Sequence, residues 1–262
     1  MNQVDYPSDH WAQDGDPQSA LAKAADLGRL PVNVVEWEMF TSLLPASLAG
    51  QTVLDYGCGL GGLSLLAAQR GARVRGMDRS ATAIHTAQYQ ARVVGLSEQC
   101  EFSVQSAGDC GLEQYDLIMA KDVIEHIEDD ERWVNGTTAA LKPGGTLILS
   151  TQNSQSLNYL IEASYHRWWR GNRGWMGWDP THVRFYTPQS LRRLLSRHGL
   201  TVTKWASMWI IPYNLVSWLT LLKVDLTLPG LGQIDRWLGY TFPFNRLGWC
   251  LMSVCQKQSQ DK

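Results

Sequence analysis

The sequence predicts an α/β domain in which a mostly parallel sheet carries helices on both faces. Five short apolar runs, at 52–56, 73–77, 100–105, 115–120 and 146–151, alternate with helix-compatible stretches at 62–70, 80–94 and 129–141. Apolar strands that alternate with helices are typical of a parallel sheet buried on both sides. The length of 262 residues, 44% of them hydrophobic, suits one large domain or one domain with an insertion.

The N-terminal part predicts an arm followed by helices. The first fifteen residues are polar, and residues 17–48 predict two helices. Gly28 and Pro31 mark the break between them. Val35 and Met39 recur at helical spacing in the second helix.

In the C-terminal half of the sequence, predicted strands and helices alternate less regularly. A helix is predicted at 153–165, and another from the N-cap Thr187 to His198, where Gly199 ends it. Strands follow at 201–208 and 248–256. A turn at Lys142–Gly145 precedes the fifth strand.

We divide the chain into an N-terminal arm with helices (1–48), a core (49–208 and 245–262) with a lid at 165–186, and an apolar insertion at 209–244. The insertion packs on the domain, covers the active site as a cap, or touches a membrane through Trp218, Trp237, Lys223 and Arg236. The uncharged stretch 205–222 contains Pro212 and polar residues, so we do not expect it to span a membrane.

The charge and the cysteines restrict the class of protein. A net charge of −2 and a pI near 6.3 argue against a general polyanion binder, so we expect no nucleic-acid partner. The five cysteines form no C-x-x-C pair, and no secretory signal begins at Met1. We therefore expect a reduced, cytoplasmic protein.

A glycine-rich turn follows the first predicted strand. Gly57, Gly59 and Gly62 satisfy G-x-G-x-x-G, a pattern that fits a dinucleotide or another adenosine ligand. Asp55 lies two residues before the first glycine, where a carboxylate would repel a pyrophosphate but suit a positive group such as a methionyl ammonium. Asp78 ends the second strand, where a carboxylate accepts both hydroxyls of a ribose.

With the Leu141–Gly145 turn, these residues resemble the class I S-adenosylmethionine-dependent methyltransferases over about residues 50–200. The resemblance implies a Rossmann-like seven-stranded sheet whose last strand is antiparallel, with S-adenosyl-L-methionine as cofactor. It implies cofactor contacts by Asp55, Gly57, Cys58, Gly59, Asp78, Arg79, Ser106, Ala107 and Lys121. The family often has an acidic residue after strand three, where this chain offers Ser106 or, nearby, Asp109 for the adenine.

The segment after the fourth strand carries two carboxylates and an imidazole. On one helical turn, Asp122, Glu125 and His126 would share a face. Three hypotheses stay open: His126 is a general base oriented by a carboxylate, the three residues hold a divalent cation such as Mg²⁺, or the group only orders the loop.

Within the family, the chain is most similar to the ubiquinone-biosynthesis O-methyltransferases. The segments 122–126, 150–153 and 181–185 carry this resemblance. It implies methyl transfer to a hydroxyl of a small hydrophobic acceptor, which is aromatic, quinol-like or lipid-linked. Some of these relatives use a divalent metal at the acidic–Glu-His site, although they usually have glutamate where this chain has Asp122. An N-methyltransferase, a sugar or natural-product methyltransferase, and a non-catalytic cofactor-binding protein docked to a membrane or protein are the alternatives.

Tryptophan is concentrated in the second half, with nine of the twelve between Trp168 and Trp249. We expect a lid in which Trp168, Trp169, Trp175 and Trp178 wall the acceptor, while Arg167, Arg170 and Arg173 attract a carboxylate or a lipid phosphate. Alternation places His182 and Arg184 on one side of an extended segment, which the resemblance puts over the acceptor site. His182 is the second candidate base, and Glu125 and His126 complete the catalytic set. The alternative is that tryptophan and arginine form surface cation–π stacks without a ligand.

Overall fold

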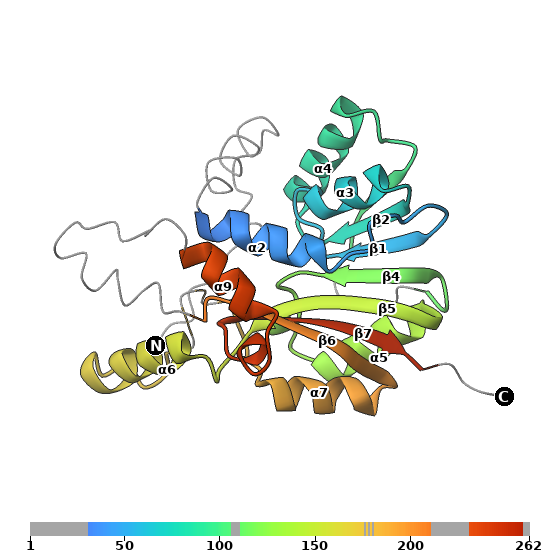
Figure 1. The fold of residues 1–262 in the computed structure, drawn as a ribbon. Coiled ribbons are helices and arrows are strands. Elements are labelled where there is room, and N and C mark those ends of the chain that lie inside the picture. Colours follow the sequence, from blue (N-terminus) through green and yellow to red (C-terminus); the bar gives the residue numbers. More distant parts are fainter. Residues whose placement is uncertain are drawn as a thin grey trace.

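A computed structural model describes residues 31–105, 111–175, 177, 179, 181–210 and 231–258. Its centre is a seven-stranded sheet in the order β3-β2-β1-β4-β5-β7-β6 (Figure 1). The strands are β1 Thr52–Tyr56, β2 Arg73–Asp78, β3 Cys100–Val104, β4 Tyr115–Ala120, β5 Leu141–Gln152, β6 Leu200–Met208 and β7 Cys250–Lys257. Only β7 runs against its neighbours, since it pairs antiparallel with both β5 and β6. The predicted α/β class and the antiparallel last strand are confirmed.

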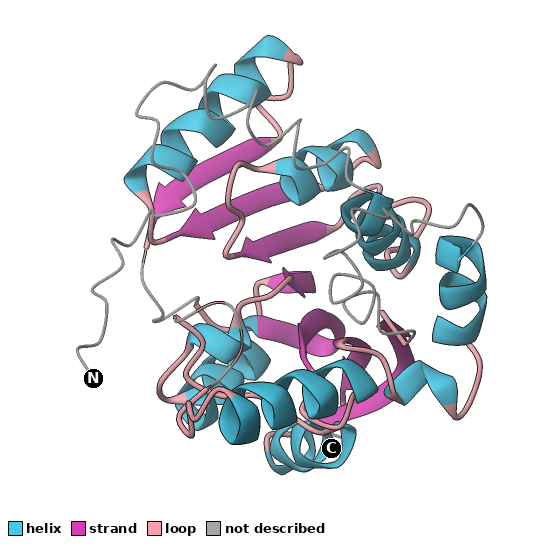
Figure 2. Cartoon of the chain, turned by 90° about the vertical axis from the view of Figure 1, so that its left-hand side faces the viewer, coloured by secondary structure: helices cyan, strands magenta, loops and turns pink. Residues whose placement is uncertain are grey.

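Helices cover both faces of the sheet (Figures 1 and 2). One layer contains α2 Pro31–Ser42, α3 Gly62–Gln69, α4 Ala81–Val93 and α9 Leu231–Gly239, and the other contains α5 Asp130–Ala140 and α7 Pro188–Arg197. Each layer has its own apolar core, with Phe40 and Ile148 in the first and Val134 and Leu195 in the second. The helix α6, Leu157–Ser164, lies beside these layers and continues into a π-helical turn at Tyr165–Trp169.

Local signals explain several boundaries. Thr187 caps α7 by accepting from the backbone N–H of Ser190, and Pro188 takes the first helical position as predicted. The predicted helix at 153–165 begins only at Leu157, because Ser156 caps it while Asn153 donates from its amide to two backbone carbonyls near β7. The predicted turn at Lys142–Gly145 is instead a bulge inside β5, which already pairs with β4 at Leu141.

The N-terminal arm, the first predicted helix and residues 211–230 of the insertion lie outside the described residues, and with them Trp218 and Lys223. The described part of the insertion packs on the domain through α9. There the buried Asp235 carboxylate accepts from the backbone N–H groups of Trp209 and Ile210. None of the helices in the described ranges is both long enough and apolar enough to cross a membrane.

The strand order locates the ligand-binding edge of the sheet. β1 lies between β2 and β4, so the connections leave it toward opposite sides. In parallel α/β sheets, a crevice opens at the carboxyl ends of the strands where the order reverses.

Candidate active site

A cavity of about 810 Å³ opens at this reversal point. Its walls come from the ends of β1, β2 and β4 and from one side of α5, and include Gly57, Asp78, Lys121 and Trp133. The cavity therefore joins the predicted cofactor segments to a second region that the sequence did not mark.

The glycine turn borders the cavity directly. Gly57 has a φ of +69°, and a Cβ at this position would lie 2.6 Å from Cγ2 of Val123. Only glycine fits both the left-handed backbone and the close approach of Val123. The N–H of Gly59 donates to Oδ2 of Asp78 at 2.9 Å, which ties the turn to the end of β2.

Asp78 lies where the sequence predicts it, at the end of β2 and in the cavity wall. Its Oδ1 accepts from the N–H of Ser80 at 2.9 Å. Burial raises the pKa of Asp78, while the backbone hydrogen bonds from Ser80 and Gly59 lower it. Each carboxylate oxygen keeps acceptor capacity beyond its backbone bond, which suits a pair of hydroxyl donors.

Asp55 lies beneath the turn rather than in the cavity wall. Its Oδ2 accepts from the hydroxyl of Ser64 at 2.6 Å, and the residue is 1% exposed. Burial raises the pKa of Asp55 to about 6, against the hydrogen bonds from Ser64. The predicted direct contact with an ammonium is therefore not seen at the cavity surface, and Asp55 supports the glycine turn from behind.

The other predicted cofactor residues fall into three groups. Arg79 and Lys121 line the cavity. Cys58 is a buried free thiol outside the lining, and burial raises its pKa. Ser106 and Ala107, with Asp109, lie outside the described residues. Gln105, just before them, lines the cavity.

Lys121 and Asp122 both line the cavity and belong to a charged cluster that extends to α2. The Nζ of Lys121 lies 2.5 Å from Oδ2 of Asp122 and 2.7 Å from Oε1 of Glu36 on α2. Asp122 has a φ of +54° and also accepts from Oγ of Ser150 at 2.8 Å. This left-handed residue stands before the 3-10 turn at Ile124–His126 and directs its carboxylate toward β5 and Lys121.

The expected face of Asp122, Glu125 and His126 is thus wrong, because the helical turn begins only after Asp122. In the described chain, potential ligand atoms lie within 4.8 Å of one another in two groups, Glu125–His126–His182 and Glu36–Asp122–Cys250. The second group already holds the Lys121 ammonium. The first offers two imidazole nitrogens and one carboxylate oxygen, whereas Mg²⁺ prefers oxygen ligands. The residues do not fit a magnesium site.

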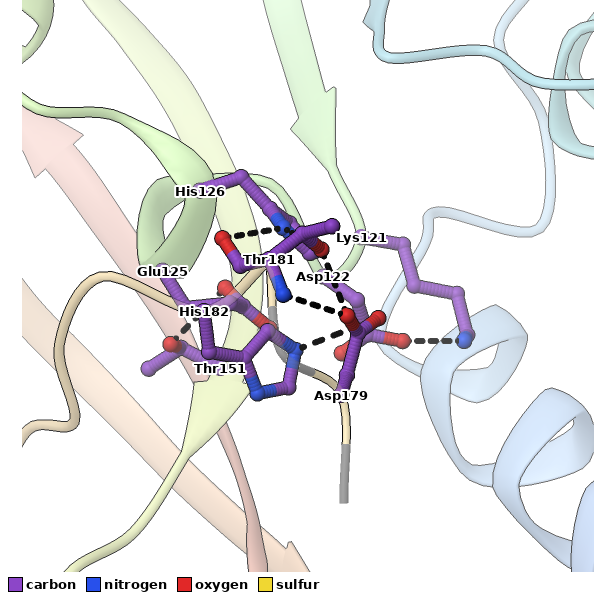
Figure 3. Close-up of polar contacts among 8 residues, drawn as sticks. All are labelled: Lys121, Asp122, Glu125, His126, Thr151, Asp179, Thr181 and His182. Atoms are coloured by element: carbon purple, nitrogen blue, oxygen red, sulfur yellow. Dashed lines mark hydrogen bonds and ion pairs between the residues drawn. The ribbon is translucent and has the colours of Figure 1, made fainter. Parts of the chain in front are cut away.

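Glu125 is fully buried behind His126. Its Oε2 accepts from the hydroxyl of Thr151 at 2.9 Å (Figure 3). Burial and the nearby Asp122 raise the pKa of Glu125 to about 8. The carbonyl oxygen of Glu125 accepts from the N–H of Val183 at 2.9 Å. Glu125 therefore fastens the 3-10 turn to the segment 181–186 and does not border the cavity.

His126 does line the cavity, together with Asp179. Its Nδ1 lies 3.0 Å from the hydroxyl oxygen and 3.3 Å from the carbonyl oxygen of Thr181 (Figure 3). The Thr181 hydroxyl donates to Oδ1 of Asp179 at 2.6 Å. Burial lowers the pKa of His126, while Asp179 opposes this effect.

His182 stacks edge-on against His126, with ring centroids 4.7 Å apart, and lies outside the cavity lining. Its Nε2 is 3.9 Å from Oδ2 of Asp179. Burial and the neighbouring His126 lower the pKa of His182 to about 4. Of the two candidate bases, only His126 reaches the cavity.

Of the predicted lid, Asp179 lines the cavity, whereas the described substrate candidates lie outside its lining. Trp168 and Trp169 are 87% and 83% exposed on the π-helical turn. Trp175 is buried in a stack with His166, whose ring centroid is 4.7 Å away. Arg184 pairs with Asp130 at 2.5 Å, outside the cavity lining. The contact of these four residues with an acceptor stays a prediction, and Trp178 lies outside the described residues.

Sequence reasoning missed Asp179, Thr181 and the face of α5 that borders the cavity. The α5 face includes Arg132, Trp133 and Asn135. The sequence did contain a signal for Asp179 and Thr181. An Asp two residues before a Thr, next to a proline, favours a turn closed by a hydrogen bond to the Asp side chain. Here Oδ1 of Asp179 accepts from the N–H of Thr181 at 2.8 Å.

Comparisons with known proteins agree with this geometry. Residues 36–204 match the family described as methyltransferase domain. The ubiquinone biosynthesis O-methyltransferase of Methylobacterium sp. (strain 4-46) is 36% identical over 167 residues, which cover 60% of this chain and 63% of the relative. The mitochondrial protein of that name from Rattus norvegicus is 30% identical over 64% of this chain and 49% of its own. The matches thus span less than two thirds of these relatives.

Solved structures share the fold. The magnesium protoporphyrin IX methyltransferase of Synechocystis PCC 6803, solved with bound SAH, has a TM-score of 0.59 at 19% identity and covers 87% of this chain and 86% of its own. An S-adenosylmethionine-dependent methyltransferase from Mesorhizobium loti has a TM-score of 0.57 at 18% identity and covers 85% of this chain and 98% of its own.

Proposed function

Because this chain belongs to the methyltransferase family, we propose that it binds S-adenosylmethionine in the cavity and methylates a hydroxyl group of a small hydrophobic acceptor. One observation carries the proposal. A single cavity contains a glycine turn that only glycine can form, a carboxylate suited to a ribose diol, and an imidazole whose pKa is lowered.

The cofactor end of the cavity fits the nucleoside part of this molecule. Gly57 and Gly59 let a ligand approach the backbone, and Asp78 offers both oxygens to the ribose hydroxyls. Asp55 holds the turn in place through Ser64. S-adenosylmethionine supplies a methyl group that its sulfonium makes electrophilic.

The chain must then orient the acceptor and remove its hydroxyl proton. His126 is the residue for the second task, because burial keeps its imidazole neutral near pH 7. The proton of the acceptor hydroxyl passes to this imidazole as the oxygen gains the methyl group. Glu125 and His182 position the segments around His126 and do not meet the acceptor.

The acceptor class follows from the cavity wall. The cavity lining includes the apolar and aromatic side chains of Tyr56, Met77, Leu112, Val123, Ile127 and Trp133, beside charged residues such as Glu128 and Arg132. Such a lining suits a planar aromatic or quinol-like molecule. The names of the curated relatives support an acceptor of this kind.

We test the cofactor assignment by calorimetric titration with S-adenosylhomocysteine. Asp78→Asn should weaken binding about 10- to 100-fold, since it removes charge-assisted hydrogen bonds. Glu101 is an exposed carboxylate on β3, so Glu101→Gln is the matched control and should bind S-adenosylhomocysteine like the wild type. Absence of binding to the wild-type protein would exclude the cofactor assignment.

The acceptor is tested with a panel of catechols, quinols, sugars and amines, with S-adenosylhomocysteine formation as the readout. Turnover of phenolic hydroxyls is the expected result. Turnover of amines alone would replace the O-methyl proposal by N-methyl transfer, and binding without any turnover would favour a non-catalytic cofactor-binding protein.

A second proposal concerns a lipid surface. Leu157, Leu160 and Ile161 are exposed on one side of α6, whereas the opposite side, which includes Tyr159 and Glu162, is buried. Trp168 and Trp169, on the π-helical turn that follows α6, are also exposed, as are Arg170 and Arg173 further along the chain. An outward apolar helix face with adjacent cations favours peripheral contact with an anionic bilayer. We call these seven residues the α6 face.

A further inference from the structure

We infer that Thr181 and Asp179 hold His126 in the tautomer that carries its proton on Nδ1, which leaves the lone pair on Nε2 to accept the acceptor's proton. This inference rests on the proposed hydroxyl methylation. It assigns positioning roles to two residues of the predicted lid that the sequence analysis does not name as site residues.

Two oxygen atoms of Thr181 face Nδ1 of His126, the carbonyl oxygen and the hydroxyl oxygen. The carbonyl oxygen of Thr181, 3.3 Å away, can only accept a hydrogen bond. It therefore favours a proton on Nδ1, because an unprotonated nitrogen would place two lone pairs against each other.

The hydroxyl proton of Thr181 points toward Asp179 and away from the His126 ring. This hydroxyl has one proton, and it donates that proton to Oδ1 of Asp179 at 2.6 Å. The carboxylate is the stronger acceptor of the two groups within reach. The hydroxyl oxygen, 3.0 Å from Nδ1 of His126, is then left with its lone pairs toward the ring.

The negative charge on Asp179 keeps the Thr181 hydroxyl proton in this direction. Burial raises its pKa, but the hydrogen bonds from the hydroxyl and N–H of Thr181 outweigh burial and lower the pKa below its usual value. Asp179 is thus ionised at neutral pH and holds the Thr181 proton firmly. Both oxygens facing Nδ1 of His126 act as acceptors, so the neutral ring keeps its hydrogen on Nδ1.

The consequence is a chain of hydrogen bonds from Nδ1 of His126 through Thr181 to Asp179 (Figure 3). A neutral imidazole has one lone pair, and here it is on Nε2. A base with the opposite tautomer would offer the acceptor hydroxyl an N–H instead of a lone pair. Asp179 and Thr181 thus determine whether His126 can act as a base at all.

The test is a long-range ¹H–¹⁵N spectrum of protein labelled in its six histidines, with His126 assigned by His126→Gln. We expect a pyrrole-type Nδ1 and a pyridine-type Nε2 in the wild type at pH 7.5. Asp179→Ala frees the Thr181 hydroxyl to donate to Nδ1, so the spectrum should shift toward the Nε2–H tautomer. A wild-type ring protonated on Nε2 would overturn the inference.

Activity gives the second readout, using the acceptor found in the panel. Thr181→Val should lower kcat about tenfold or more without changing KM, because only the fraction of rings in the productive tautomer reacts. Thr181→Ser restores the hydroxyl and should recover both kcat and the wild-type spectrum. Thr203→Val, on the exposed side of β6, controls for the loss of a hydroxyl.

An unchanged tautomer and kcat in Thr181→Val contradict the inference. Rescue by Thr181→Ser separates positioning from misfolding, since both variants occupy the same site. The spectra need no turnover, so a protein that methylates no hydroxyl would overturn the proposed function while the tautomer is still measured.

Discussion

Glu36 on α2 and Lys121, which lines the cavity just after β4, form an ion pair with Nζ 2.7 Å from Oε1. The pair fastens the first described helix to the strand that leads into the 3-10 turn at Ile124–His126. Their side chains are mostly shielded from solvent, unlike the pair between Glu38 and Arg236 on the outer side of α2.

The two pairs predict different effects on stability. Lys121→Met leaves the carboxylates of Glu36 and Asp122 without their cation, so we expect a loss of about 3 kcal/mol in the free energy of unfolding. Glu38→Gln, which breaks the exposed pair, should cost less than about 1 kcal/mol. Urea denaturation measures both. Equal losses would show that burial of the Glu36–Lys121 pair is irrelevant.

Asp55 predicts a stability difference that depends on pH. Burial raises its pKa from 3.8 to about 6, so the folded protein binds this proton more tightly than the unfolded chain. The stabilisation is present below about pH 4 and is lost as pH rises to about 6. The free energy of unfolding of the wild type minus that of Asp55→Asn should fall by about 2 to 3 kcal/mol from pH 4 to 7.

Asp116→Asn is the control for this series, because the Asp116 pKa is lowered instead. Burial opposes the shift, but hydrogen bonds from Lys142 and from the N–H of Thr52 outweigh it. The corresponding difference should therefore rise with pH. Parallel pH profiles for the two variants would contradict the buried, protonatable Asp55.

His126 predicts the pH dependence of the reaction. Burial lowers its pKa below 6.5, against the effect of Asp179, so the free base predominates at neutral pH. We expect kcat/KM to rise with pH through a pKa below 6.5 and to level off near pH 7. His126→Ala should lower kcat about 100-fold or more and abolish this limb. His85→Ala, on the exposed side of α4, should change neither; an acid limb that survives in His126→Ala assigns the base elsewhere.

The α6 face predicts binding to anionic vesicles. The double variant Trp168→Ser/Trp169→Ser should reduce co-sedimentation with phosphatidylglycerol vesicles about tenfold or more, since two exposed indoles no longer enter the interface. Val93→Ser/Val94→Ser removes two exposed apolar side chains at the end of α4 and is the matched control. Equal binding by both variants, or equal binding to neutral phosphatidylcholine vesicles, would rule out the proposed anionic contact.

The strands and the cofactor turn were predictable because their signals are local. Each apolar run became a strand within a few residues, with the β4 bounds unchanged, since continuous burial on both faces requires continuous apolar sequence. Gly57 and Asp78 follow directly from the ends of β1 and β2. Their positions in the cavity wall therefore needed no long-range information.

The surroundings of His126 were less predictable because they depend on tertiary contacts. The left-handed backbone of Asp122 has no periodic signature, and it removed this carboxylate from the expected face. The bond between His126 and Thr181 joins residues 55 positions apart. Trp175 is buried and Trp168 is exposed, although both are tryptophans in the same stretch of sequence. Residue type alone therefore could not predict which of the two is buried.

The hydrogen bond from the N–H of Val183 to the carbonyl oxygen of Glu125 joins two segments that are far apart in the sequence. Separate stretches of chain therefore form different parts of the cavity and its surroundings. The glycine turn and Asp78 come from residues before 80, whereas His126 and its partners Asp179 and Thr181 come from two later stretches. We therefore expect the chain to be modular. Grafting another α5 surface should change acceptor preference while nucleotide affinity is inherited unchanged, which makes this scaffold suitable for recombining substrate specificities.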